Sequence, residues 1–380
     1  MTQRKWLGSI ILIVICLVIS TVRLEANGIH EFSSGKFGSS PQQPQVTVAP
    51  DGSIYLVYGS ENTIYCALSR DRGKTFSTPV ALANEGPMSL GMHRGPRIAA
   101  TKDFVVITAV VGKQGKGRDG SLLAWRSADR GKTWGKSVTV NDAVDSPREG
   151  LHGMAAGPSN FVFAAWLDLR ALVPGKPGTE LYGAVSDDGG LTWRRNVLVY
   201  HSPDGYICQC CHPSVAINQK RQIYVMWRNA LGGARDMYLT ASADGGKTFA
   251  TAQKLGEGTW PLNACPMDGG EITVTRANEP ETVWRREDQI FVSGTGGAAE
   301  QPVGRGRNPV IAYGTKGRYV AWQDSSEKSV VLLAPDAKEP VRLGTNSTYV
   351  DLIAGPGGTV IAAWEESDKE KKTVKVQILS

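Results

Sequence analysis

The sequence lacks a strong excess of charge of either sign. Its net charge is +6, of which the first 26 residues carry +2, so +4 remains for the rest of the chain. It also lacks a basic helix and an arginine-rich tract, the features with which nucleic-acid-binding domains attract phosphates. These absences exclude nucleic acid as an expected partner.

Long apolar runs are also missing, except near the start of the chain. There, Arg4 and Lys5 precede an unbroken apolar run over residues 10–19, and a tolerable cleavage position follows Ala26. This order is typical of a signal peptide, so we expect a protein exported to the periplasm or beyond. An uncleaved membrane anchor through residues 7–22 is the alternative.

The chain has 380 residues but shows no division into two domains, because one repeat organises it. The pattern Ser-x-Asp-x-Gly-x-Thr-aromatic occurs four times, starting at Ser69, Ser127, Ser186 and Ser242, at intervals of 58, 59 and 56 residues. Asp and Gly favour a tight turn, and the Asp and Thr side chains can bond nearby backbone amides. The four aspartates are Asp71, Asp129, Asp188 and Asp244.

A second repeat extends along residues 40–380. Short apolar strands recur in seven units of 40 to 60 residues, and five of the second strands end in tryptophan. We therefore expect an all-β fold, a single propeller of seven four-stranded blades over residues 27–380. Six blades is the alternative if residues 271–303 form none. Residues 28–34 could supply the missing outer strand of the last blade and close the ring.

The eight-residue repeats resemble the Asp-box (BNR) repeats of sialidase-like β-propellers, and the resemblance implies that their aspartates are structural. A Cys-x-Cys-Cys run and the later stretch Trp260-x-x-Asn-Ala-Cys265-Pro are similar to an exported bacterial subgroup of that family. The resemblance implies the propeller fold. It implies sialidase activity only weakly, because fold does not determine function and the catalytic motif is incomplete.

In such a fold, the loops that lead into the innermost strands meet at one mouth of the central channel. Three of the five histidines and four of the six cysteines fall in these loops. Two disulfides are one interpretation, favoured by export. A soft copper(I) or zinc site is another, because thiolates and imidazoles suit these ions. The candidates for either are Cys208, Cys210, Cys211, Cys265, His212, His93, His152 and Met267.

The same loops carry arginines and acids suited to a glycosidase. Sialidase-like enzymes hold a substrate carboxylate with arginines and use a tyrosine nucleophile with Glu and an acid/base. The corresponding candidates here are Arg94, Arg148, Arg307, Glu149, Asp268 and Tyr349. The Arg-Ile-Pro motif of sialidases is missing and the residue order differs, so charge pairing across loops is the alternative.

Three functions therefore stay open for a chain that we expect to be monomeric. The first is binding or hydrolysis of a glycan or another small anionic ligand at the channel mouth. The second is binding of copper or zinc by the Cys/His/Met cluster. The third is an interaction scaffold without chemistry, whose cysteines form disulfides. Whether the chain is an enzyme stays open as well.

Overall fold

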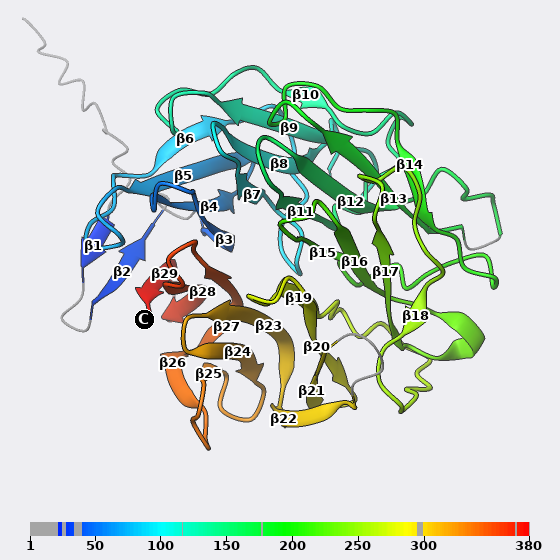
Figure 1. Cartoon of the computed structure of the whole chain (residues 1–380). Coiled ribbons are helices and arrows are strands. Elements are labelled where there is room, and N and C mark those ends of the chain that lie inside the picture. The colour runs from blue at the N-terminus through cyan, green and yellow to red at the C-terminus, as the bar shows by residue number, and fades with distance from the viewer. Residues whose placement is uncertain are drawn as a thin grey trace, which may run out of the picture.

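The computed structural model describes residues 22–24, 28–33, 40–115, 117–175, 178–294, 299–368 and 371–379. Its strands form seven antiparallel sheets arranged around a central channel (Figure 1). The expected seven-bladed propeller is thus confirmed, and residues 271–303 do form a blade. The predicted signal peptide lies outside the described residues, apart from the short strand β1 (Val22–Leu24).

Six blades have four strands that follow one another in the chain from the channel outward, and the last blade has three such strands. The innermost strands are β3 (Gln42–Val48), β7 (Arg97–Ala100), β11 (His152–Ala156), β15 (Ser214–Ile217), β19 (Glu271–Val274), β23 (Arg307–Gly314) and β27 (Ser347–Ala354). The second strands are β4 (Ile54–Ser60), β8 (Val105–Val111), β12 (Val162–Asp168), β16 (Ile223–Arg228), β20 (Pro280–Arg286), β24 (Gly317–Asp324) and β28 (Val360–Asp368).

The third and outer strands complete the sheets. The third strands are β5 (Thr63–Ser69), β9 (Ser121–Ser127), β13 (Glu180–Ser186), β17 (Met237–Ser242), β21 (Gln289–Gly294), β25 (Ser329–Leu333) and β29 (Lys371–Ile378). The outer strands are β6 (Val80–Ala83), β10 (Val138–Thr139), β14 (Val197–Tyr200), β18 (Gln253–Lys254), β22 (Gln301–Arg305) and β26 (Val341–Thr345). One short 3-10 turn, η1 (Leu231–Gly233), joins β16 to β17.

The last blade joins the two ends of the described chain. Its outer position is taken by β2 (Ile29–Phe32), which pairs antiparallel with β29 and carries β1 on its free edge (Figure 1). His30 Nε2 also hydrogen-bonds the backbone oxygen of Gly73 at 2.8 Å, in the first blade. The expected closure of the ring by an N-terminal strand is confirmed.

The core lies between blades rather than inside any one of them. Second strands such as β8 are buried along their whole length because neighbouring blades cover both of their faces. Trp227 packs with Phe163 of the preceding blade, and Trp364 packs with Ala321 in the same way. Aromatic side chains bury about 150–250 Å² each, so these contacts bind the blades together. Among the described residues, no helix is long and apolar enough to span a membrane.

Each Asp-box forms a turn between the third and fourth strands of its blade. In the first box, Thr75 N and Thr75 Oγ1 donate to the Asp71 carboxylate at 2.9 and 2.5 Å, and Gly73 N donates to Ser69 Oγ at 2.8 Å. Hydrogen bonds from Thr75 lower the pKa of Asp71 to about 2. These turns lie on the face opposite the loops that lead into the innermost strands.

Candidate functional site at the channel mouth

Several innermost strands contain, within their first three residues, one residue in the left-handed region. Gln43, Asn308 and Tyr349 have φ of 55°, 52° and 48°, and the strand pairing shifts register around each of them. An extra residue of this kind is a β-bulge, which redirects a side chain at the rim of a sheet. In this chain the bulges of different blades bring side chains together at the mouth.

The segment between β6 and β7 closes that mouth. It carries His93, whose Nε2 donates to Asn308 Oδ1 at 2.9 Å. The His93 ring stacks on His212 with centroids 4.2 Å apart and meets the edge of Tyr349 at 5.1 Å. Arg97 Nη2 donates to the His93 backbone oxygen at 2.5 Å. His93 thus contacts three other blades, and burial lowers its pKa.

The predicted arginines do not meet at one point. Arg94 donates to the backbone oxygen of Glu149 at 2.5 Å and pairs with its carboxylate at 3.5 Å. Arg148 adjoins this pair in the chain and is half-buried. Arg307 is exposed. The pKa of Arg285 is lowered mainly by burial, and the charge of Arg307 has a smaller effect in the same direction. Among the described residues, no contact joins Arg307 to Arg94 or Arg148.

The predicted acid and tyrosine are already engaged. Asp268 is 1% exposed, lies 3.1 Å from Arg285 Nε, and accepts from Asn308 N at 2.9 Å. Tyr349 packs edge-on against His93. Burial raises the pKa of Tyr349, and the charge of Glu365 raises it further. Neither group lines the two cavities described below.

Three of the four predicted cysteines do come together. The Cys208 sulfur lies 3.7 Å from that of Cys210 and 3.5 Å from that of Cys211, and the latter two are 3.9 Å apart. No disulfide joins any cysteine among the described residues, and Cys265 is exposed and outside this group. We call Cys208, Cys210 and Cys211 the cysteine triad.

The three thiols of the triad differ in acidity. Hydrogen bonds from Cys210 and then Cys211 lower the pKa of Cys208 to about 3. Burial, followed by the contact with Cys208, raises the pKa of Cys211 to about 11, and the bond to Cys208 raises that of Cys210. One sulfur of the triad is therefore the first to become a thiolate, with the other two thiols turned towards it.

The other predicted metal or disulfide residues lie around the triad or away from it. His212 follows Cys211 directly, but its ring faces His93, and burial lowers its pKa well below the usual value. His152 bonds Thr108 Oγ1 at 3.0 Å in a fully buried position, and burial lowers its pKa to about 3. Met267 has a left-handed φ of 54° in the loop before β19.

Sequence reasoning missed a group of acids near the channel. Asp351, Glu271 and Glu365 each accept a backbone N–H from the first strand of the next blade, at 2.8, 2.9 and 2.7 Å. Burial raises the pKa of Asp351 to about 6 and of Glu365 to about 7. Their position in the innermost or second strand of a blade is the only signal that the sequence offers.

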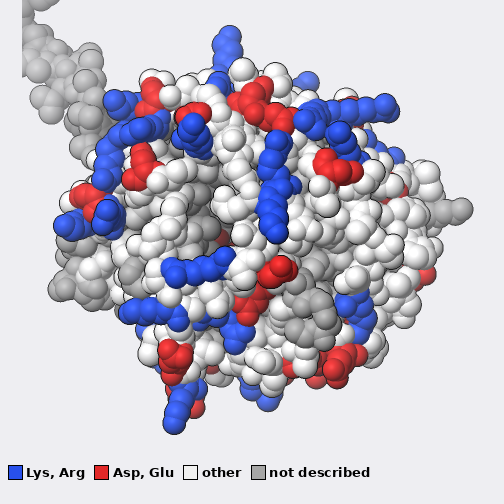
Figure 2. Space-filling view, viewed as in Figure 1, with Lys and Arg blue, Asp and Glu red and all other residues white. Residues whose placement is uncertain are grey.

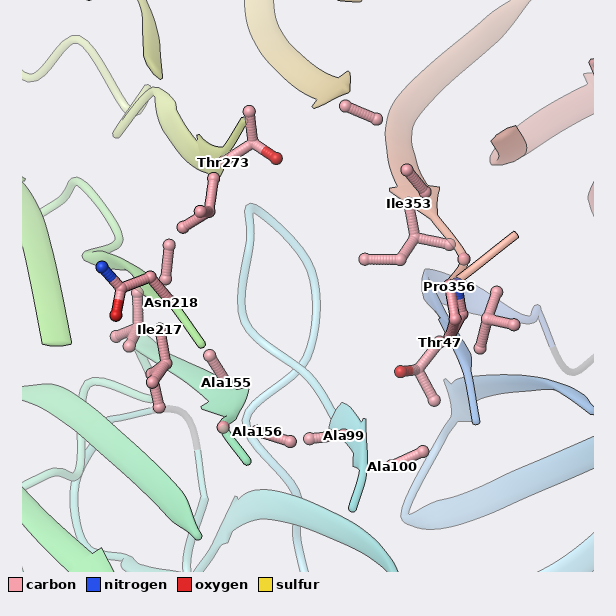
Figure 3. Close-up of a pocket in the computed structure, with 18 of the residues that line it drawn as sticks. Thr47, Ala99, Ala100, Ala155, Ala156, Ile217, Asn218, Thr273, Ile353 and Pro356 are labelled. Carbon is pink, nitrogen blue, oxygen red and sulfur yellow. The ribbon is translucent and has the colours of Figure 1, made fainter. Parts of the chain in front are cut away.

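The channel forms a cavity of about 780 Å³. Figure 3 shows its wall, with Ala99, Ala155, Asn218, Thr273 and Ile353 arranged around the opening. Its rim includes turns between first and second strands, which lie on the same face as the Asp-boxes. The channel therefore opens on the face opposite the mouth that the β6–β7 segment closes.

A second hollow of about 610 Å³ lies on the mouth face. The side chains that line it come from the loops before β11, after β12 and before β15. They are Arg148, Leu169, Leu172, Val173, Pro174, Gly175 and Gln209. No carboxylate pairs with Arg148 among the described residues. We call this cavity the Arg148 hollow.

On the surface seen in Figure 2, basic and acidic side chains are intermixed around a central depression.

The fold and its turns define a seven-bladed β-propeller with four Asp-boxes on one face. Residues 98–282 match the family model described as a BNR repeat-like domain. In this stretch the chain is similar to BNR-repeat, sialidase-like β-propellers. No curated protein matches the sequence significantly.

Solved structures share this fold at low identity. A protein of unknown function from Dyadobacter fermentans is 14% identical with a TM-score of 0.52, over 95% of this chain and 97% of that chain. An α-L-arabinofuranosidase from Fusarium graminearum in complex with arabinobiose is 13% identical with a TM-score of 0.54, over 90% and 95%. The Hadza microbial sialidase is 14% identical with a TM-score of 0.51, over 90% and 66%. At these identities the likeness shows the fold alone.

Proposed function

We propose that this propeller binds an acidic saccharide in the Arg148 hollow. The observation that carries the proposal is a half-buried guanidinium, without a carboxylate partner among the described residues, in the wall of an open hollow. A planar guanidinium can bond both oxygens of a carboxylate. The other walls suit the rest of a sugar acid.

Those walls combine apolar and polar contacts. Leu172, Val173 and Pro174 offer an apolar surface to the face of a sugar ring or to an acetyl methyl group. The Gln209 side chain can donate to and accept from hydroxyl groups. A concave, mostly apolar site with a few polar groups is the usual form of a small-molecule site.

The engaged state of the candidate catalytic groups favours binding over hydrolysis. A glycosidase needs two carboxyl groups, or a tyrosine with its acid, free to reach the glycosidic bond. Here Glu149 pairs with Arg94, Asp268 pairs with Arg285, and Tyr349 packs against His93. We therefore propose a lectin-like role, with no bond cleaved.

The comparisons supply modest support for a saccharide ligand. Structural relatives include an arabinofuranosidase with arabinobiose and a leech trans-sialidase with a sialic acid derivative. These proteins place saccharide chemistry on this fold. Their ligands do not transfer to this chain residue by residue, since the identities are 13% and 11%.

Calorimetric titration tests the proposal with two acidic probes, 3'-sialyllactose and trigalacturonate, and with lactose as the neutral control. We expect at least one acidic probe to bind and lactose not to bind. Arg148→Met should weaken binding at least tenfold, and Arg148→Lys should weaken it less. The control Arg195→Met, an exposed arginine outside the hollow, should bind as the wild type does.

Two results would contradict the proposal. If neither acidic probe binds, or if Arg148→Met binds as tightly as Arg195→Met, the Arg148 hollow is not a site for sugar acids. Release of free sialic acid from sialyllactose would show hydrolysis and would overturn the lectin-like role.

We also propose that the chain acts outside the cytoplasm, because a basic start and an apolar run precede Ala26. Cell fractionation with N-terminal sequencing tests this location. A mature protein that begins at Asn27 in an extracytoplasmic fraction is the expected result, and a cytoplasmic protein that begins at Met1 would contradict it.

A further inference from the structure

We propose that the cysteine triad binds a thiophilic d10 metal ion, Cu(I) or Zn(II), independently of any saccharide. The triad lies in the loop before β15, and its three sulfurs form a triangle with sides of 3.5, 3.7 and 3.9 Å.

The size of the triangle is that of metal-bound thiolates. A disulfide would bring two sulfurs to about 2.05 Å. Two thiolates bound to one tetrahedral ion at about 2.3 Å are instead about 3.8 Å apart. All three sulfur separations lie near the second value, so one ion at the centre can contact all three sulfurs at once.

The backbone holds the triad in this arrangement. Cys208 N donates to the backbone oxygen of Arg228 at 3.1 Å, which ties the start of the loop to β16. Asp268 N donates to the Cys211 sulfur at 3.4 Å, which ties its end to the loop before β19. A backbone N–H directed at a sulfur stabilises negative charge on it, and a loop fixed at both ends loses little entropy when an ion binds.

A buried cation beside the triad lacks a carboxylate partner. The Arg228 guanidinium is 1% exposed, and it donates to the backbone oxygens of Asp268, Arg235 and Arg285 at 2.8, 2.5 and 2.9 Å. Among the described residues no acid pairs with it. Two other arginines are buried: Arg285, which pairs with Asp268, and Arg97, which like Arg228 donates to backbone oxygens.

Buried charges require compensation. Arg228 adjoins the triad, because its backbone oxygen accepts from Cys208 N at 3.1 Å. Three thiolates with a divalent ion carry one net negative charge, which Arg228 balances. An anionic metal–thiolate centre beside Arg228 would therefore be compensated by a charge that the fold already buries there.

The ligand set restricts the ion to two candidates. No histidine or carboxylate joins the triad within ligand distance in the described part of the chain. Thiolate ligands select Cu(I), Zn(II) and iron–sulfur clusters, and of these Cu(I) and Zn(II) bind as single ions. Three sulfurs complete a trigonal Cu(I) site, whereas Zn(II) takes a fourth ligand, for which water can enter beside the half-buried Cys210. Binding releases the thiol protons to solvent.

Anaerobic reconstitution tests the proposal and separates the two ions. The full mature chain, purified without a metal-affinity step and fully reduced, is offered Zn(II) alone or Cu(I) alone and then desalted against a chelator. We expect one equivalent of one ion to be retained. X-ray absorption at the edge of that metal should count three sulfur ligands at about 2.3 Å.

Cysteine variants locate the site. Cys208→Ser, Cys210→Ser and Cys211→Ser should each lower the affinity at least tenfold, whereas Cys66→Ser and Cys265→Ser should retain one equivalent. Cys66 is buried in another blade and Cys265 is exposed, so they are matched controls. Circular dichroism checks that each variant is folded. Of the three substitutions, the one at the half-buried Cys210 should disturb the fold least.

Three outcomes would overturn the proposal. One is a reduced, folded wild-type chain that retains neither ion. Another is a loss of metal affinity in Cys265→Ser as large as that in Cys211→Ser. The third is an X-ray absorption spectrum that gives fewer than three sulfur ligands. Loss of saccharide binding in Arg148→Met with metal retained would leave this inference intact.

Discussion

The imidazole ring of His93 lies on that of His212, with centroids 4.2 Å apart and planes inclined by 21°. His93 belongs to the segment between β6 and β7, and His212 follows the cysteine triad. The stack therefore connects the segment that closes the channel mouth to the loop that presents the three sulfurs. Burial lowers the pKa of both rings, so the stack is between two neutral imidazoles at neutral pH.

Loss of this contact should lower the stability of the protein. His93→Ala removes the bond to Asn308 and the ring contacts with His212 and Tyr349. A buried hydrogen bond and an aromatic pair each contribute about 0.5–1.5 kcal/mol, so we expect a loss of about 1–3 kcal/mol in the free energy of unfolding. Urea unfolding measures it.

The matched control for this prediction is His201→Ala. His201 pairs with Glu180 at 2.7 Å, but its side chain is 52% exposed, and surface pairs contribute about 0–1 kcal/mol. Equal losses in the two variants would show that His93 does not hold the mouth closed.

The buried Glu365 should make the stability of the protein depend on pH. Burial raises its pKa to about 7 from an ordinary value of 4.5. Between these values the folded state keeps a proton that the unfolded state has released, so the free energy of unfolding falls as the pH rises. The contribution is fully present below pH 4.5 and is lost as the pH rises through 7.

Glu365→Gln should remove that contribution. The amide oxygen can still accept from Gln43 N, which bonds the carboxylate at 2.7 Å in the wild type. We expect the fall in unfolding free energy between pH 4.5 and 7 to be less steep in the variant, by up to about 1.4 kcal/mol per pH unit. Urea unfolding at several pH values measures the slope, and identical slopes would contradict the prediction.

Gly269 sits where a side chain would disturb the site. A Cβ atom there would collide with the backbone oxygen of His212 and would lie 2.8 Å from its Nδ1. Overpacking of this kind costs about 1–3 kcal/mol, so Gly269→Ala should lower stability by that amount. Because His212 follows Cys211, we also expect weaker metal uptake.

Thermal unfolding and metal content measure these two effects. Gly357→Ala is the control, because a Cβ at Gly357 has no atom within 4 Å. If Gly269→Ala melts and binds metal as Gly357→Ala does, the packing of His212 against Gly269 has no role in the site.

The fold was predictable because its blades correspond to repeats in the sequence. Each Asp-box combines a turn, a hydrogen-bonding aspartate and an aromatic anchor in eight adjacent residues, so local spacing is enough to find it. The closing strand at Ile29–Phe32 was also predictable, because the last unit had only three strands. These features depend on short-range patterns and on the count of strands in a blade.

The site was predictable only in part. The loops before the innermost strands were found, and with them the three sulfurs of the triad. The exposed position of Cys265 and the closure of the mouth by His93 were not, because both depend on how irregular loops fold back in space. The buried charge of Arg228 was hidden at the end of an apolar strand, where its sequence context is that of the core.

The pairing of β2 with β29 has a consequence for the order in which the molecule is made. β29 follows every other strand in the chain, so the ring can be completed only after nearly all of the chain has been synthesised. Until then β2 has no partner in the last blade, so the first segment of the described chain must wait for the last strand before it can pair.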